Sequence, residues 1–136
     1  MATTRPQPVN PKQVKLFLAD ARKKAAAARK NLGIDEEAAY QIAYQAMLKA
    51  SLALMLSHGQ RPRVQLGHHA AIIEFARKSL DPPLALVFAL FDRMRRKRND
   101  AFYDIALISR AEAKEAVRVA EDYLKAVSAE IQARIP

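Results

Sequence analysis

A chain of 136 residues suits one domain, and 51% hydrophobic residues are enough to bury a core without a metal or a disulfide. The absence of cysteine excludes disulfides and thiolate chemistry and agrees with a reducing cytosol, while only three glycines beside many alanines favour helix. No run approaches the roughly 20 apolar residues that cross a bilayer, and the start lacks a signal-peptide pattern. We therefore expect a cytoplasmic protein without a membrane partner.

The net charge of +9 favours polyanionic partners such as nucleic acid or an acidic protein surface. It is unevenly distributed, because residues 1–34 hold eight Lys or Arg against one acid, which gives +7, whereas residues 109–136 hold five of each sign. A solvated basic helix that keeps the protein soluble would give the same pattern, so both interpretations stay open.

Residues 1–10 are predicted to form an N-terminal arm ahead of a single helical domain over residues 11–136. Asn10 can cap the first helix and Pro11 can take its first position. The helix should run to about Leu32, with basic residues off an apolar line of Val14, Leu18, Ala21, Ala25, Ala28 and Leu32.

A second helix is predicted over about residues 36–58. Gly33 offers the left-handed conformation that commonly closes the preceding helix, and Asp35 can cap the new one. The segment is apolar around much of its circumference, with Tyr40 and Tyr44 on one face. It is therefore predicted to be the central helix of a bundle, and both tyrosines are expected in its core.

The next segments are shorter. Turn-forming residues and two arginines predict a loop without regular structure over residues 59–67. A third helix is expected over about residues 68–79, and a fourth should begin at Pro82 with Asp81 as its cap. A break is expected near residues 104–108.

The last helix has the clearest pattern. Ser109 and Glu112 form a capping box, and the apolar line that follows is Ala113, Val117, Ala120, Leu124, Val127 and Ile131. No segment alternates apolar and polar residues for long, so no strand is expected. The sequence predicts an all-α, up-and-down bundle of four to five helices.

The most informative residue is Arg98. Steps of four and three along the fourth helix lead from Val87 through Phe91 and Met94 to Arg98, so this arginine continues a packing line. A buried unpaired charge costs several kcal/mol, in round terms, so Arg98 must be paired or must open onto a cleft. Arg95 continues the parallel line.

Two interpretations of this segment remain. Arg96 and Asp100 could form an ordinary ion pair within the helix, which explains Arg96 but not the position of Arg98. Alternatively, a cleft is lined by the candidate binding residues Arg95, Arg98, Asn99, Asp100 and Tyr103.

At this segment the chain resembles the HEPN superfamily of helical bundles, found in toxin–antitoxin pairs, in defence nucleases and beside minimal nucleotidyltransferases. The family's signature is an arginine, commonly followed by asparagine, and a histidine four to six positions later. Arg98 and Asn99 match its start, and the order of helices resembles the family from about residue 11 to residue 131. The resemblance implies a homodimer, RNA or a nucleotide as ligand, and a nucleotidyltransferase-type protein as a possible partner.

The chain departs from the family at Tyr103, which stands where the histidine is expected. In active members the arginine steadies the scissile phosphate and the histidine handles protons in a metal-independent RNA cleavage. The ordinary tyrosine pKa, near 10, makes a poor base at neutral pH. We therefore lean against enzymatic activity; if any remains, Arg98 and Tyr103 are the candidate catalytic residues.

Other sites are less well supported. His58, His68 and His69 are the only histidines, and their spacing does not suit a metal site, so no metal or cofactor is expected. His68 and His69 are expected to open the third helix near the surface.

Three functions follow from the sequence. The leading hypothesis is a HEPN-like binding module that engages RNA, a nucleotide or the acidic surface of a partner. The alternatives are a divergent ribonuclease, whose missing base is Tyr103 or a histidine from elsewhere, and a purely structural bundle.

Overall fold

The computed structural model describes residues 4–63, 68–80, 82–103 and 108–135, with only the backbone of His68 and of residues 99–103. This part of the chain contains two short strands and five helices, which confirms the all-α prediction. The elements are β1 (Thr4–Pro6), α1 (Pro11–Lys30), α2 (Glu36–Ser57), β2 (Gln60–Pro62), α3 (His68–Leu80), α4 (Ala85–Tyr103) and α5 (Arg110–Arg134).

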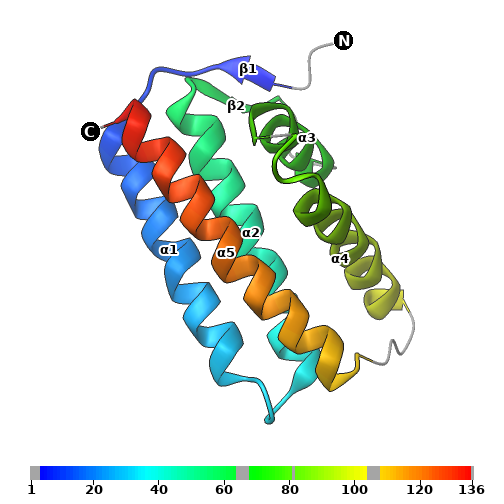
Figure 1. The fold of residues 1–136 in the computed structure, drawn as a ribbon. Coiled ribbons are helices and arrows are strands. Elements are labelled where there is room, and N and C mark those ends of the chain that lie inside the picture. The colour runs from blue at the N-terminus through cyan, green and yellow to red at the C-terminus, as the bar shows by residue number, and fades with distance from the viewer. Residues whose placement is uncertain (1–3, 64–67, 81, 104–107, 136) are drawn as a thin grey trace.

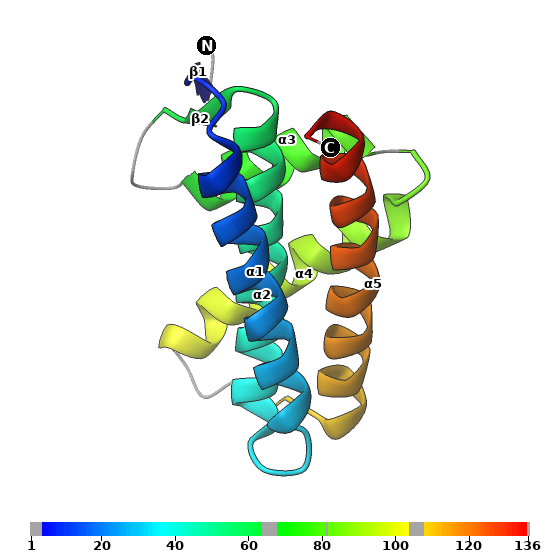
Figure 2. The same ribbon diagram turned by 90° about the vertical axis from the view of Figure 1, so that its left-hand side faces the viewer.

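The helices form two groups. Helices α1, α2 and α5 lie side by side along most of their length, and α1 and α5 each pack more extensively on α2 than on each other (Figure 1). Helices α3 and α4 lie together on the other side of α2, and α4 crosses α2 obliquely (Figure 2). The central position predicted for α2 is confirmed.

The core has a different character in the two groups. Between α1, α2 and α5 it is rich in alanine, with Ala21, Ala43 and Ala50 fully buried. Between α4 and the rest it is aromatic, because Phe91 meets Tyr44 of α2 and Tyr123 of α5, and Phe88 meets Tyr123, with ring centroids 5.6–5.7 Å apart. Small side chains let helices approach closely, whereas the rings hold α4 further out.

The predicted helix starts are largely confirmed. The Asn10 side chain accepts hydrogen bonds from the backbone N–H groups of Lys12 and Gln13, and the Asp35 side chain accepts one from Ala38. Ser109 and Glu112 form the expected capping box. Gly33 lies in the turn between α1 and α2 with φ of +84°, in the left-handed region that favours glycine.

The prediction that no strand forms is wrong. Residues Thr4–Pro6 pair antiparallel with Gln60–Pro62, and the backbone N–H of Gln7 donates to the carbonyl of Gly59 at 3.0 Å. The predicted N-terminal arm and the predicted loop therefore bind each other. Strands of three residues are too short to show the alternation by which a sequence reveals a strand.

The start predicted for the fourth helix is also wrong. Residues 82–84 form a turn, closed by a hydrogen bond from the backbone N–H of Ala85 to the carbonyl of Pro82 at 3.2 Å, and the helix begins at Ala85. The break predicted near residues 104–108 falls mostly on residues outside those described. No helix in the described part of the chain is both long enough and apolar enough to span a membrane.

Candidate functional site

The candidate site is centred on Tyr44, which projects from the middle of α2. Its side chain is fully buried, and its ring packs edge-on against Phe91 of α4. Its hydroxyl lies 3.2 Å from Nδ1 of His69, in the first turn of α3. This buried tyrosine therefore links the central helix to both members of the α3–α4 pair, and the expectation that Tyr44 belongs to the core is confirmed.

Arg98 lies against the same tyrosine. The guanidinium carbon of Arg98 is 5.7 Å from the centroid of the Tyr44 ring, a cation–π arrangement, and the side chain is half-buried. Phe91 and Met94, earlier on the same line of α4, are fully buried. The prediction that Arg98 continues the packing line is confirmed.

The basic run 95–98 divides its side chains between different partners. Arg95 and Arg96 both pair with Asp92, at 3.2 Å and 2.9 Å, and Lys97 pairs with Glu112 at the start of α5. Among the residues that the structure describes, no carboxylate pairs with Arg98. A half-buried cation without such a partner within the described chain is suited to bind an anion.

The electrostatics of the Tyr44 hydroxyl follow from this setting. Burial raises the pKa of Tyr44 to about 12, the nearby charges of Arg98 and Arg95 lower it, and Asp92 raises it. The phenol is therefore protonated at neutral pH. It can donate to Nδ1 of a neutral His69 or accept from Nδ1–H, according to the tautomer of the imidazole.

A pocket of about 490 Å³ lies between α3 and α4, next to these groups. Arg95 and Asp92 line its α4 side, and Ala70, the residue after His69, lines its α3 side. Arg98 is not among the lining residues. The two arginines predicted to share one cleft therefore differ, because Arg95 faces this pocket whereas Arg98 covers Tyr44.

Three predicted site residues belong to the last turns of α4. The side chains of Asn99, Asp100 and Tyr103 lie outside the described part of the structure, so their membership of the site stays a prediction. The pair predicted for Arg96 and Asp100 falls there too, although Arg96 reaches Asp92 instead. We refer to Tyr44, His69, Arg95 and Arg98 as the Tyr44 cluster.

Sequence reasoning missed two parts of this arrangement. His69 was expected merely to open α3 near the surface, but it is half-buried and meets a tyrosine 25 residues earlier, a contact that no local pattern reveals. Asp92 could have been found, because it precedes Arg95 by three residues and Arg96 by four, the spacing of neighbours on a helix.

The described residues offer no metal centre. No group of three His, Cys, Asp or Glu side chains gathers among them in a way that could hold an ion. The basic first helix is partly neutralised, since Lys24 pairs with Asp20 and Arg29 pairs with Glu121 of α5. Lys12, Lys15 and Lys23 are exposed.

No family model matches this sequence, and no curated protein matches it.

Proposed function

We propose that this chain is a HEPN-like binding module that holds RNA by a backbone phosphate at the Tyr44 cluster. The observation that carries the proposal is the position of Arg98, half-buried over the ring of Tyr44, with no carboxylate partner among the described residues. Its three basic neighbours all have such a partner. Arg98 is therefore the cation of this run that can take an external anion without breaking an ion pair seen here.

The geometry suits a phosphate for a specific reason. The guanidinium carbon of Arg98 lies 5.7 Å from the centroid of the Tyr44 ring, and the N–H groups of a guanidinium lie in one plane and can grip two oxygens at once. His69, whose Nδ1 lies 3.2 Å from the hydroxyl of the same tyrosine, is in the first turn of α3, where the helix dipole favours negative charge. The net charge of +9 favours the approach of a polyanion.

The same proposal includes a homodimer, in which two copies of the arginine motif face one groove. Two-fold pairing uses the same surface of both chains. Light scattering at tens of micromolar should then give about twice the chain mass of 15.2 kDa. A mass near that of one chain would remove the dimer from the proposal. A nucleotidyltransferase-type partner is a prediction from the resemblance alone.

The binding test is fluorescence anisotropy with a labelled single-stranded RNA. We expect Arg98→Ala to weaken binding at least about tenfold, or roughly 1.4 kcal/mol. Arg98→Lys should weaken it too, because lysine lacks the planar fork. The matched control is Arg118→Ala on α5, where the arginine is two-thirds exposed and pairs with Asp122.

The outcome also separates the rival functions. Unchanged binding by Arg98→Ala would overturn the proposal and favour a purely structural bundle. Equal losses of RNA affinity for Arg98→Ala and Arg118→Ala would show that the loss comes from the change in net charge alone. Competition by a nucleoside monophosphate as strong as that by the RNA would assign the site to a nucleotide instead.

The second candidate is a metal-independent ribonuclease, favoured by the convergence of His69 and Arg98 on Tyr44. A histidine from α3 could supply the base that Tyr103 does not. His69 would take the proton of a ribose 2′-hydroxyl as its oxygen attacks phosphorus, and the P–O5′ bond would break. The products are a 2′,3′-cyclic phosphate and a 5′-hydroxyl, whose oxygen takes its proton from solvent water, and the His69 imidazolium returns its proton to solvent.

Cleavage in excess chelator tests this candidate. We expect His69→Ala to abolish the cyclic phosphate product while weakening RNA binding less than Arg98→Ala does, and a 2′-deoxy substitution at the cleaved position to block the reaction. Tyr103→His asks whether the family's own base restores or increases cleavage. Intact RNA after long incubation with the unmodified chain would exclude the candidate.

A further inference from the structure

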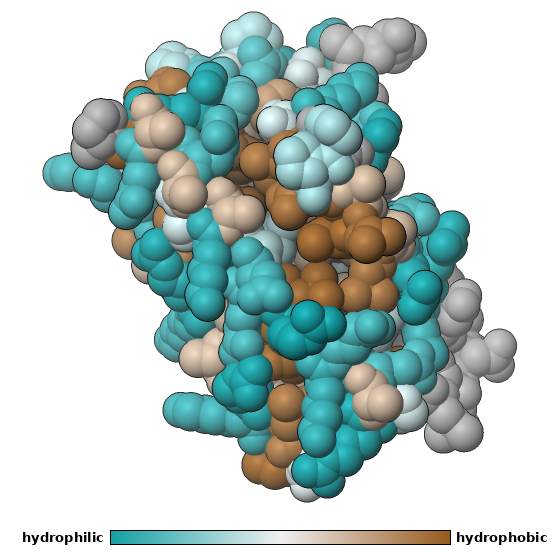
Figure 3. Space-filling model, in the orientation of Figure 1, coloured by the Kyte–Doolittle hydropathy of each residue, from teal (hydrophilic) through white to brown (hydrophobic). Residues whose placement is uncertain are grey.

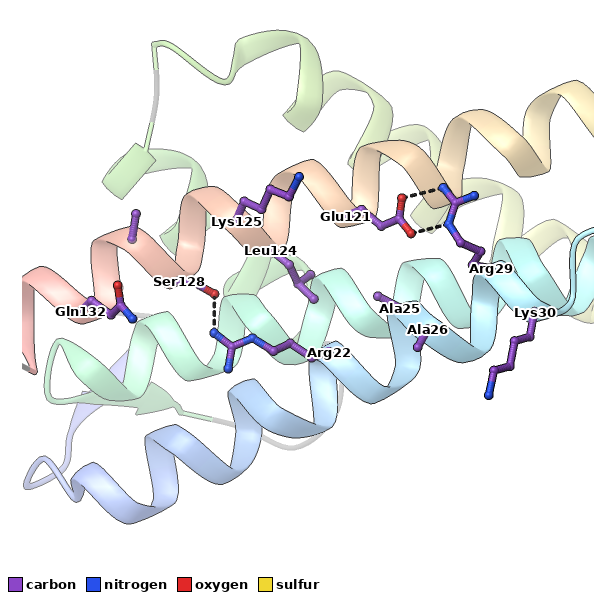
Figure 4. Close-up of a pocket in the computed structure, with 11 residues that line it drawn as sticks. Arg22, Ala25, Ala26, Arg29, Lys30, Glu121, Leu124, Lys125, Ser128 and Gln132 are labelled. Carbon is purple, nitrogen blue, oxygen red and sulfur yellow. Dashed lines mark hydrogen bonds and ion pairs between the residues drawn. The ribbon is translucent and has the colours of Figure 1, made fainter.

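A second hollow lies between α1 and α5 and shares no lining residue with the Tyr44 cluster. Its volume is about 820 Å³, compared with about 490 Å³ for the pocket between α3 and α4. It exists because α1 and α5 both pack mainly on α2, which leaves a groove where they face each other. Figure 4 shows its lining side chains on these two antiparallel helices.

The floor of the groove is apolar and shallow. Ala25 and Leu124 are buried at its base, and Ala26 and Ala129 are exposed along its sides. Short side chains of this kind allow the backbone of another helix to approach closely. None of the lining residues is aromatic, so the groove has no ring on which a nucleic acid base could stack.

The edges of the groove are basic. Arg22, Arg29, Lys30 and Lys125 line it against one acid, Glu121. Two of these cations already bridge the helices: Arg29 makes two hydrogen bonds of 2.6 Å to Glu121, and Arg22 donates to the hydroxyl of Ser128 at 3.1 Å (Figure 4). Within the described structure, Lys30 and Lys125 form no ion pair. The groove therefore presents two lysines outside any ion pair of the described structure, one on each helix, of which Lys125 lies close enough to Glu121 to help lower the pKa of that carboxyl.

We propose that this groove is the docking site for an acidic amphipathic helix of a partner protein. Its α5 side extends from Glu121 to Gln132, or about 16 Å at 1.5 Å per residue, which accommodates roughly three turns of helix. Small apolar residues at i, i+3 or i+4 and i+7 of the partner would lie on the alanine floor. Flanking Glu or Asp side chains would then reach Lys30 and Lys125.

The charge of the groove favours an acidic helix over a second copy of the chain as its occupant. In a two-fold dimer formed through this groove, the lysines of one copy would face the same basic surface of the other, which disfavours the contact. Single-stranded RNA matches the sign of the edges but gains little from an apolar floor without aromatic side chains. An acidic helix matches both the edges and the floor. The site lies on a different surface from the proposed RNA site and does not depend on it.

The probe is a labelled peptide of about 15 residues, long enough to form helix on binding, with Leu and Ala on one face and Glu elsewhere. The matched peptide carries Lys in place of Glu. We expect Lys30→Glu with Lys125→Glu to weaken binding of the acidic peptide more than about tenfold. The control pair, Lys15→Glu with Lys114→Glu, changes the net charge equally on the same two helices but outside the groove, and should have an effect within about twofold.

The floor has its own test in Ala129→Trp, which fills an exposed position of the groove and should block the peptide without altering any charge. Methyl signals of Ala25 and Leu124 should shift on titration with the acidic peptide. The proposal is overturned if the acidic peptide does not bind, if both lysine pairs weaken it equally, or if single-stranded RNA displaces it from these methyl groups. A dimer that Lys30→Glu with Lys125→Glu dissociates would assign the groove to a second copy instead.

Discussion

The unit formed by α1, α2 and α5 and the pair formed by α3 and α4 use different side chains to pack on α2. The first unit is joined by alanines, of which Ala21, Ala43 and Ala50 are fully buried, and its helices begin at well-formed caps. The second is held by Phe88 and Phe91 against Tyr44 and Tyr123. In Figure 3, hydrophobic residues reach the surface mainly between α5 and the α3–α4 pair. The alanine-packed unit thus buries small polar groups such as the hydroxyls of Ser51 and Tyr123, which lie 2.6 Å apart, whereas the aromatic seam formed by these four rings also admits the charged side chains of the Tyr44 cluster.

The largest expected effect concerns the stability of the first unit. Leu54 of α2 is fully buried, so Leu54→Ala should lower the free energy of unfolding by about 2–5 kcal/mol, because it removes buried methyl groups and leaves a cavity. Leu86 of α4 is 88% exposed, and Leu86→Ala should change that free energy by less than about 0.5 kcal/mol. Urea denaturation measures both. Similar losses for the two variants would contradict the burial described here.

Two buried tyrosines of α2 should make the fold sensitive to alkali. Burial raises the pKa of Tyr40 and of Tyr44 from 10.0 to about 12, so the unfolded chain loses these protons first. Stability should therefore fall as pH rises from about 10 to about 12. Thermal midpoints across this range, with phenolate absorbance recorded in parallel, provide the measurement. The stability of Tyr44→Phe should fall less steeply than that of the unmodified chain, and an equal slope would show that Tyr44 does not contribute to this pH dependence.

The cap of α5 offers a smaller effect on the first unit. The Ser109 hydroxyl accepts a hydrogen bond from the backbone N–H of Glu112 at 3.0 Å. Ser109→Ala should cost about 0.5–2 kcal/mol, and Ser109→Asp, which keeps a capping oxygen, should restore most of it. Chemical denaturation of the two variants checks this. Equal stability of the alanine and aspartate variants would mean that the cap contributes nothing.

The smallest expected effect concerns the contribution of α1 to RNA binding, which we compare with that of the Tyr44 cluster. Lys12, Lys15 and Lys23 are exposed on α1, and replacing all three by Gln removes three charges that can neutralise phosphates. If they contact single-stranded RNA, the slope of log K against log salt should decrease by about 2, with a smaller loss of affinity than for Arg98→Ala. Anisotropy at several salt concentrations gives both quantities. An unchanged slope would assign the basic charge of α1 to solubility.

The sequence predicted the first unit better than the second. Asn10, Asp35 and the Ser109–Glu112 box act within a few residues of themselves, so local rules locate the helix starts. The contacts of Tyr44 depend on how α3 returns to α2 and on the angle at which α4 crosses it, which no local rule supplies. Arg98 was predicted only in part: helical periodicity placed it on the packing line, but did not reveal that it lies over the ring of Tyr44.

The strands and the groove also depend on contacts between distant segments, so no local pattern predicted them. The β1–β2 pair joins segments 56 residues apart through backbone groups, which carry no sequence pattern. The alanine-rich faces of α1 and α5 were visible in the sequence. The groove between these two faces arises only in the folded structure, because α1 and α5 both pack mainly on α2.

The central claim is that RNA phosphate binds at the Tyr44 cluster and not simply along basic α1. The most direct measurement is an NMR titration that follows the Arg98 guanidinium, the His69 imidazole and the ammonium groups of Lys12 and Lys15 as single-stranded RNA is added. Our account predicts that the Arg98 and His69 signals change most and saturate together, with the affinity measured by anisotropy. Large changes on α1 while the Arg98 and His69 signals stay in place would contradict it.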